Sequence, residues 1–111
     1  MKVTICGSLK FEKQINDWHE ALAMAGHTPY CMVVLPSQKD GVKDWYTPEQ
    51  KTMLDLIHLS KIEESDAILV VDVEGYIGES TTREIAWARI RGKKVYFATL
   101  QDYVGDLQYT S

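Results

Sequence analysis

One segment in the middle of the chain limits its fold more than any other. Residues 67 to 73 read AILVVDV, an almost uninterrupted run of apolar residues, most of them β-branched. A strand with one solvent-exposed face would alternate apolar and polar side chains, whereas this run fits a parallel strand that is covered on both faces. We therefore expect a central strand here, with helices on either side of its sheet.

The rest of the chain alternates between strand and helix patterns. Further strands are expected at residues 3–6, 28–35 and 94–98, with helices between the strands. Thr47, followed by Pro48 and Gln50, predicts a helix start in which threonine caps a helix with proline at its first position. This alternation predicts an α/β fold, a flavodoxin/Rossmann-like three-layer sandwich with a parallel sheet of four to five strands, as a single domain over residues 1–111.

Composition and charge exclude several kinds of partner. The net charge is −4, from 12 basic and 16 acidic residues, and the scattered Lys and Arg residues argue against a nucleic acid polymer as ligand. No apolar run approaches the roughly 18 residues of a membrane span, so no membrane partner is expected. The N-terminal sequence lacks a secretory pattern and predicts a cytoplasmic protein. A chain this short is expected to complete its active surface as a homodimer or higher homo-oligomer.

The two cysteines are expected to be structural. Cys6 and Cys31 both fall in predicted strands, where a reduced cysteine serves as a small apolar residue. Two cysteines alone make neither a metal site nor a disulfide framework. We therefore expect no metal and no cofactor.

Ligands of open parallel sheets bind beyond the carboxyl ends of the strands, and this rule selects two loops. The first loop, residues 6–11, offers Gly7, Ser8 and the Lys10 amine, a set that suits an anion at a helix start. An equally good interpretation is that Gly7 only permits the turn and Ser8 only caps the helix. In a flavodoxin-like strand order this loop lies beside the second loop, residues 72–82.

The second loop, residues 72–82, begins at Asp72 and leads into a predicted helix. Gly78, Glu79 and Ser80 place backbone N–H groups and polar side chains at the helix start, which suits a phosphate or a sugar. Glu84 follows near that start, where the helix dipole favours an ionised carboxylate. Thr81 and Glu84 also match a capping box, in which Glu84 would bind the Thr81 backbone and perform no chemistry.

Three segments together resemble the nucleoside 2-deoxyribosyltransferase superfamily, which includes a 2'-deoxynucleoside 5'-monophosphate N-glycosidase branch. They are CGSLK after the first strand, KIEESDAILVVDV leading into GYIGEST, and EIAWA followed by GKKVYF. The resemblance implies that Glu84 is the nucleophile that attacks the anomeric carbon of the sugar. It also implies that the Gly7–Ser8 loop binds a 5'-phosphate, which favours a nucleotide substrate and hydrolysis over transfer to a second base.

The chain departs from the family pattern at three positions. His58 stands where the family has an aspartate that handles the base, and Asp55, three residues earlier, could orient it as a proton-transfer pair. The alternative is that His58 only borders the apolar stripe of its helix. Thr4 replaces a tyrosine that orients the glutamate in the family. Gly78 replaces an aspartate or serine, which Glu79 or Ser80 could compensate.

Two functions therefore remain open. The first is cleavage of the N-glycosidic bond of a (deoxy)nucleoside 5'-monophosphate or nucleoside, with Glu84 as nucleophile. Trp45 and Tyr46 could cover the base, and an equally good interpretation is that they only lead into the helix that begins at Thr47. The second is a non-catalytic module that binds or senses nucleotides through the same loops. In both, the partner is a small nucleoside or nucleotide.

Overall fold

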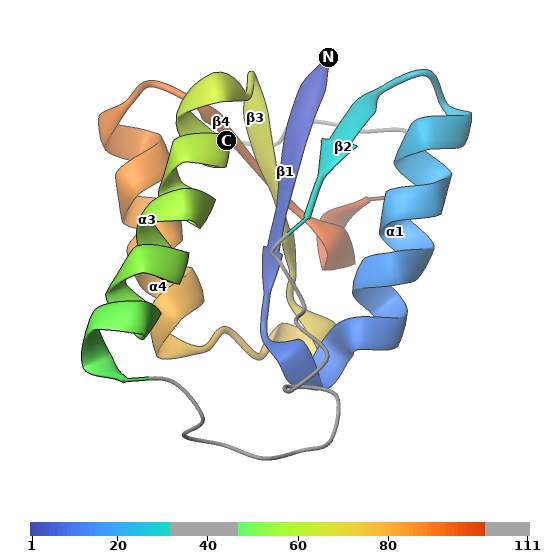
Figure 1. The fold of residues 1–111 in the computed structure, drawn as a ribbon. Helices are drawn as coiled ribbons and strands as arrows, with labels where there is room; N and C mark the ends of the chain where they lie inside the picture. The colour runs from blue at the N-terminus through green and yellow to red at the C-terminus, as the bar shows by residue number, and fades with distance from the viewer. Residues whose placement is uncertain (32–46, 102–111) are drawn as a thin grey trace.

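A computed structural model describes residues 1–31 and 47–101 of the protein (Figure 1). Three of the sequence predictions fall outside these residues. They are the second strand beyond residue 31, the long loop that carries Trp45 and Tyr46, and any element after residue 101.

Four strands and three main helices alternate along the described chain, together with three short 3₁₀ helices. The strands are β1 (Lys2–Gly7), β2 (Thr28–Tyr30), β3 (Ala67–Val71) and β4 (Lys94–Phe97). The main helices are α1 (Glu12–Met24), α3 (Pro48–Glu64) and α4 (Glu79–Ile90), and the short ones are η1 (Leu9–Phe11), η2 (Val73–Gly75) and η3 (Ala98–Leu100).

The strands form one parallel sheet in the order β2-β1-β3-β4. Val3 pairs with Ala67 and Gly7 with Val71, so the first and third predicted strands are neighbours, as expected. Helix α1 covers one face of the sheet, and α3 and α4 cover the other (Figure 1). The predicted α/β architecture is confirmed.

Strand β1 sends alternate side chains into two separate cores. Val3 and Ile5 pack in the core under α1, with Trp18 and Leu22. Cys6 points to the opposite face and packs in the core under α3 and α4, with Ile62. Because successive side chains of a strand point to opposite faces, Thr4 lies on the Cys6 side as well. This face is the one from which the candidate site is built.

The ends of the elements follow the local sequence signals. At the start of α3, Thr47 Oγ1 accepts a hydrogen bond from Gln50 N at 3.1 Å and Gln50 Oε1 accepts one from Thr47 N at 2.8 Å, which confirms the predicted capping box. Gly26 and Gly92 follow α1 and α4 with positive φ angles of 90° and 72°, a conformation that glycine adopts without a steric penalty. No helix of the described residues is both long and apolar enough to cross a membrane.

Strand β3 ends at Val71, earlier than the apolar run predicts. Asp72 leaves the sheet and accepts two hydrogen bonds from Thr99, one from its backbone N at 3.1 Å and one from Oγ1 at 2.8 Å. The chain then turns through η2, where Glu74 takes a left-handed conformation with φ of 54°. The last two residues of the run thus form the turn that leads toward α4.

Candidate functional site

The two loops selected from the sequence meet at the carboxyl edge of the sheet. The ring of Tyr76, from the second loop, meets the ring of Phe11 edge-on, with 5.8 Å between the centroids. The Lys10 amine lies 3.3 Å from the centroid of the Tyr76 ring. A cation over an aromatic face is stabilised by the negative charge of that face. The predicted neighbourhood of the loops is therefore present, and Tyr76 holds Lys10 between them.

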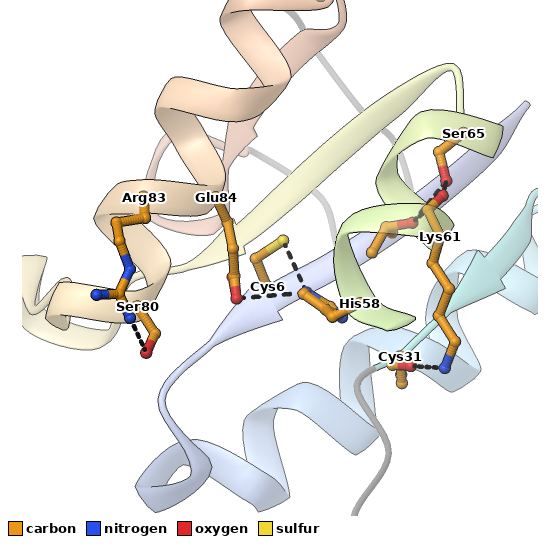
Figure 2. A network of polar contacts seen from close by, with 9 residues as sticks. Cys6, Cys31, His58, Lys61, Ser65, Ser80, Arg83 and Glu84 are labelled. Carbon is orange, nitrogen blue, oxygen red and sulfur yellow. Dashed lines mark hydrogen bonds and ion pairs between the residues drawn. The ribbon is translucent and has the colours of Figure 1, made fainter. Parts of the chain in front are cut away.

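Behind these loops, three side chains from three different elements converge (Figure 2). Cys6 comes from β1, His58 from α3 and Glu84 from α4. His58 Nε2 lies 3.5 Å from Cys6 Sγ and 3.5 Å from Glu84 Oε1. Cys6 is fully buried, and the side chains of His58 and Glu84 are 9% and 16% exposed. We refer to Cys6, His58 and Glu84 as the trio.

Two polar atoms of the trio have no hydrogen-bond partner among the described residues. They are Glu84 Oε2 and His58 Nδ1, and both are buried. Buried polar atoms in proteins are almost always hydrogen-bonded, and an unpartnered one costs about 1–3 kcal/mol. Such atoms at the carboxyl edge of a parallel sheet mark a place where a ligand could supply the missing partner.

The capping-box interpretation of Glu84 is wrong. Helix α4 begins at Glu79 with Gly78 as its N-cap, so Glu84 is the sixth residue of the helix and lies beyond its first turn. Its carboxylate meets His58 instead of the Thr81 backbone. The structural role that competed with chemistry for Glu84 is therefore absent.

The predicted pairing of His58 with Asp55 is also not found. Asp55 is exposed, and within the described part of the chain Nδ1 of His58 accepts or donates no hydrogen bond. The other ring nitrogen, Nε2, faces Cys6 and Glu84. A residue three positions earlier lies on the same side of a helix, but here α3 turns Asp55 to solvent while His58 faces the sheet.

The trio also fixes the protonation of its cysteine. Burial raises the pKa of the Cys6 thiol well above its usual 9.0, and the charge of Glu84 and its hydrogen bond to the thiol raise it further. A thiol held in its protonated form is a poor nucleophile. Cys6 is therefore disfavoured as a nucleophile, and Glu84 stays the candidate that the sequence suggests.

The glycine and serine of the first loop both have structural roles. A Cβ atom on Gly7 would lie 3.3 Å from both Cβ and the carbonyl oxygen of Val71, so the close approach of β1 to β3 favours glycine here. Ser8 is the N-cap of η1, and its hydroxyl lies 3.4 Å from the Lys10 backbone N. The structural alternative for this loop is therefore observed, while ligand binding by the same groups stays a prediction.

The second loop presents its polar groups at the start of α4. The Gly78 carbonyl accepts hydrogen bonds from Thr82 N and Thr82 Oγ1, both at 2.9 Å. Ser80 Oγ lies 3.3 Å from Arg83 Nη2, and Glu79 is exposed in the first turn of α4. Asp72 is buried with both oxygens bound to Thr99, so it fixes the turn after β3.

Two solved structures share this arrangement of strands and helices. One is the CMP N-glycosidase BcmB of Clostridium botulinum, with a TM-score of 0.58 and 22% identity over 87% of this chain and 70% of that one. The other is a 2-deoxyribosyltransferase from the psychrotolerant bacterium Bacillus psychrosaccharolyticus, with a TM-score of 0.65 and 18% identity over 87% and 71% of the two chains.

The chain has the nucleoside 2-deoxyribosyltransferase-like fold. The family resemblance seen in the sequence is thereby confirmed at the level of the fold, which is all that identities this low show. No protein-family model and no curated protein matches the chain. Its activity has to be argued from its own site.

Within this fold, the departure at Thr4 has a clear structural outcome. The Thr4 hydroxyl makes hydrogen bonds with Ser65 Oγ and, at 3.2 Å, with the Lys61 carbonyl. These contacts tie β1 to the end of α3. Glu84 is instead contacted by Cys6 and by His58, the latter from the position at which the sequence departs from the family aspartate.

Cys6 is a member of the site that its sequence context does not predict. A lone cysteine in a strand is usually a small apolar residue of the core. One signal could have found it: Cys6 directly precedes Gly7 at the carboxyl end of β1 and lies on the same strand face as Thr4. It therefore points toward the helices that carry His58 and Glu84.

Proposed function

We propose that the protein cleaves the N-glycosidic bond of a (deoxy)nucleoside 5'-monophosphate or nucleoside, with Glu84 as the nucleophile. The observation that carries this proposal is the Glu84 carboxylate, which is mostly buried at the carboxyl edge of the sheet, with Oε1 toward His58 and Oε2 without a partner in the part of the chain that the structure describes. Two proteins of the same fold are described as a CMP N-glycosidase and a 2-deoxyribosyltransferase, which supports glycosidic-bond chemistry on nucleosides or nucleotides.

The two oxygens of Glu84 have different tasks in this proposal. His58 Nε2, 3.5 Å from Oε1, orients the carboxylate and leaves Oε2 to face the anomeric carbon. As the C–N bond breaks, its electron pair goes to the base, and Oε2 stabilises the positive charge on the sugar before bonding to it. The departing base takes a proton from solvent. Attack by water on the sugar ester then releases the sugar and restores Glu84.

The loops around Glu84 supply the groups that hold the rest of the substrate. We assign the 5'-phosphate to the Gly7–Ser8 backbone and to Lys10, whose amine is held over Tyr76. The start of α4 at Gly78, Glu79 and Ser80 offers N–H groups and side chains to the sugar. Asp72 contributes indirectly, because its bonds to Thr99 fix the turn before this loop. A cytoplasmic location and a homo-oligomeric state remain predictions.

The test measures by chromatography whether the protein releases free base from a panel of nucleoside 5'-monophosphates and nucleosides. Glu84→Ala should lower the rate by more than about a thousandfold, as expected when a covalent nucleophile is removed. Glu63→Ala is the matched control, because Glu63 is a partly exposed glutamate that pairs with Arg91 instead of His58. Base release that survives in Glu84→Ala contradicts the proposal.

The same panel separates catalysis from the second function, nucleotide binding without chemistry. One observation favours that alternative: Asp55 is exposed and His58 Nδ1 has no partner among the described residues, so the predicted proton-transfer pair is not formed. A non-catalytic module would show nucleotide-dependent thermal stabilisation with no base released, in the native protein as in Glu84→Ala.

A further inference from the structure

One ring nitrogen of His58 makes two contacts within the trio. His58 Nε2 lies 3.5 Å from Glu84 Oε1 and 3.5 Å from Cys6 Sγ, and the Cys6 thiol also hydrogen-bonds to Glu84. The contact between Nε2 and Oε1 is longer than the about 2.7–3.2 Å of an ordinary N–H···O hydrogen bond. Three side chains of metal-ligating type thus lie close together, while the carboxylate is only weakly bonded to the imidazole.

We propose that Cys6, His58 and Glu84 bind a single Zn²⁺ ion. Zinc–ligand bonds of about 2.0–2.3 Å in a tetrahedron place neighbouring ligand atoms about 3.3–3.8 Å apart. The two distances from His58 Nε2 match this spacing, and the ligand atoms of all three residues lie within 4.8 Å of one another. The third pair, Cys6 Sγ and the Glu84 carboxylate, lies within the same 4.8 Å.

The donor set selects the metal. A thiolate, an imidazole nitrogen and a carboxylate oxygen suit zinc, whereas magnesium and calcium prefer sites made of oxygen atoms. Three protein ligands leave the fourth position of the tetrahedron for water or an exogenous group, as in open zinc sites. When zinc binds, the S–H bond of Cys6 breaks, a Zn–S bond forms, and the proton passes to solvent.

A second observation points to a missing partner at the same place. Glu84 Oε2 is buried and has no hydrogen-bond partner among the residues that the structure describes. A cation bound by this carboxylate would provide the missing partner of Oε2, since either carboxylate oxygen can coordinate it. The ring of His58 is already turned with Nε2 toward the other two ligands, so the metal requires no change in the direction of the imidazole (Figure 2).

Zinc in this position would be an inhibitor of the proposed reaction. This consequence rests on the proposed function, since a carboxylate that coordinates zinc is no longer available to attack the sugar. The binding itself does not rest on it. Metal binding and base release are therefore measured separately, and either can fail while the other holds.

The test of binding is titration of the reduced, metal-free protein with Co²⁺ alone, since cobalt reports the zinc geometry through its spectrum. We expect one Co²⁺ per chain with a thiolate-to-cobalt charge-transfer band, and displacement of the band by one equivalent of Zn²⁺. Cys6→Ser should abolish the band. Cys31→Ser is the matched control and should keep it, because Cys31 lies outside the trio, with its carbonyl bound to Lys61 Nζ at 2.8 Å.

Glu84→Gln provides a second variant, because Glu84 is partly exposed and its replacement does not open a cavity in the core. It should raise the apparent zinc dissociation constant by more than about tenfold, since loss of even an outer-shell group typically costs 10–100-fold in metal affinity. Absence of a charge-transfer band in the native protein, its persistence in Cys6→Ser, or an unchanged zinc affinity in Glu84→Gln would each overturn the proposal.

The inhibitory consequence has its own readout. If base release is observed, Zn²⁺ should suppress it and a chelator should restore it in the native protein and in Cys31→Ser. The residual rate of Cys6→Ser, whatever its size, should not respond to the same zinc concentration. If no base is released, the proposed function fails, whereas the cobalt spectrum still decides whether the zinc site exists.

Discussion

Replacement of Glu84 by glutamine should separate stability from activity. Glutamine has the shape of glutamate and keeps an oxygen that can face His58, but it carries no charge. In the native protein a mostly buried carboxylate has one oxygen 3.5 Å from His58 Nε2, and its other oxygen has no partner within residues 1–31 and 47–101. We expect Glu84→Gln to be more stable than the native protein and to release no base.

The size of the effect follows from two opposing contributions. Loss of the long contact with His58 should cost about 0.5–1.5 kcal/mol, the net value of an ordinary hydrogen bond. Removal of the buried charge, which has no partner among the described residues, should stabilise the folded state by about 1–3 kcal/mol. The amide still leaves one uncharged polar atom without a partner. The net gain is about 1 kcal/mol. For a domain of this size that raises the Tm by about 4 °C.

The assay is thermal and urea unfolding of metal-free protein, followed by circular dichroism. Glu79→Gln is the matched control, because Glu79 is exposed in the first turn of the same helix and its charge favours the helix N-terminus. Its loss should therefore cost about 0.3–1 kcal/mol, a change of opposite sign. If Glu84→Gln instead lowers the Tm by several degrees, His58 and Glu84 form a strong ion pair and our account of the unpartnered carboxylate is wrong.

Two further predictions concern parts of the structure outside the trio. Thr99→Val should lower the free energy of unfolding by about 1.5–3 kcal/mol, because the hydrogen bond from Thr99 Oγ1 to the Asp72 carboxylate is lost. In urea denaturation, the double variant Thr99→Val/Asp72→Ala should lose less stability than the two single variants added together. Strict additivity of the two losses would show that the hydrogen bond contributes nothing. Burial raises the pKa of Cys31 from 9.0 to about 11, so its thiol ionises first in the unfolded chain and stability should fall as the pH rises from 9 to 11. In Cys31→Ser, the urea midpoint should fall less between pH 9 and pH 11 than in the native protein. An equally steep fall in the variant would contradict the raised pKa of Cys31.

Much of the fold can be predicted from the sequence because its signals are local. The apolar run at residues 67–71 becomes a strand with all five residues buried. Thr47, Pro48 and Gln50 carry a complete helix start within four residues, and the observed capping box follows it. The adjacency of the first and third strands also follows, since it is the common order for strands that alternate with helices.

The interior of the site was harder to predict because it depends on where elements cross. Helical spacing placed Asp55 beside His58, but the orientation of α3 against the sheet turns only His58 inward. The capping box of Thr81 and Glu84 failed because the helix begins at Glu79, two residues before Thr81. No local pattern predicts that Cys6, His58 and Glu84 meet, since each belongs to a different element; the family resemblance indicated His58 and Glu84, and only the strand face of Cys6 pointed toward them.

The pairing of β1 with β3 has a consequence for how the site comes into being. Val3 pairs with Ala67, and the trio combines residues as far apart in the sequence as Cys6 and Glu84. No short fragment of the chain therefore contains the site. Closing such long loops has an entropic cost, so the trio exists only when β1 is paired with β3 and the helices α3 and α4 are packed on the sheet. Binding at the trio is thus linked to the folding of the whole sheet, and a mutation that weakens a distant core residue lowers the apparent affinity of the site by depleting the folded state.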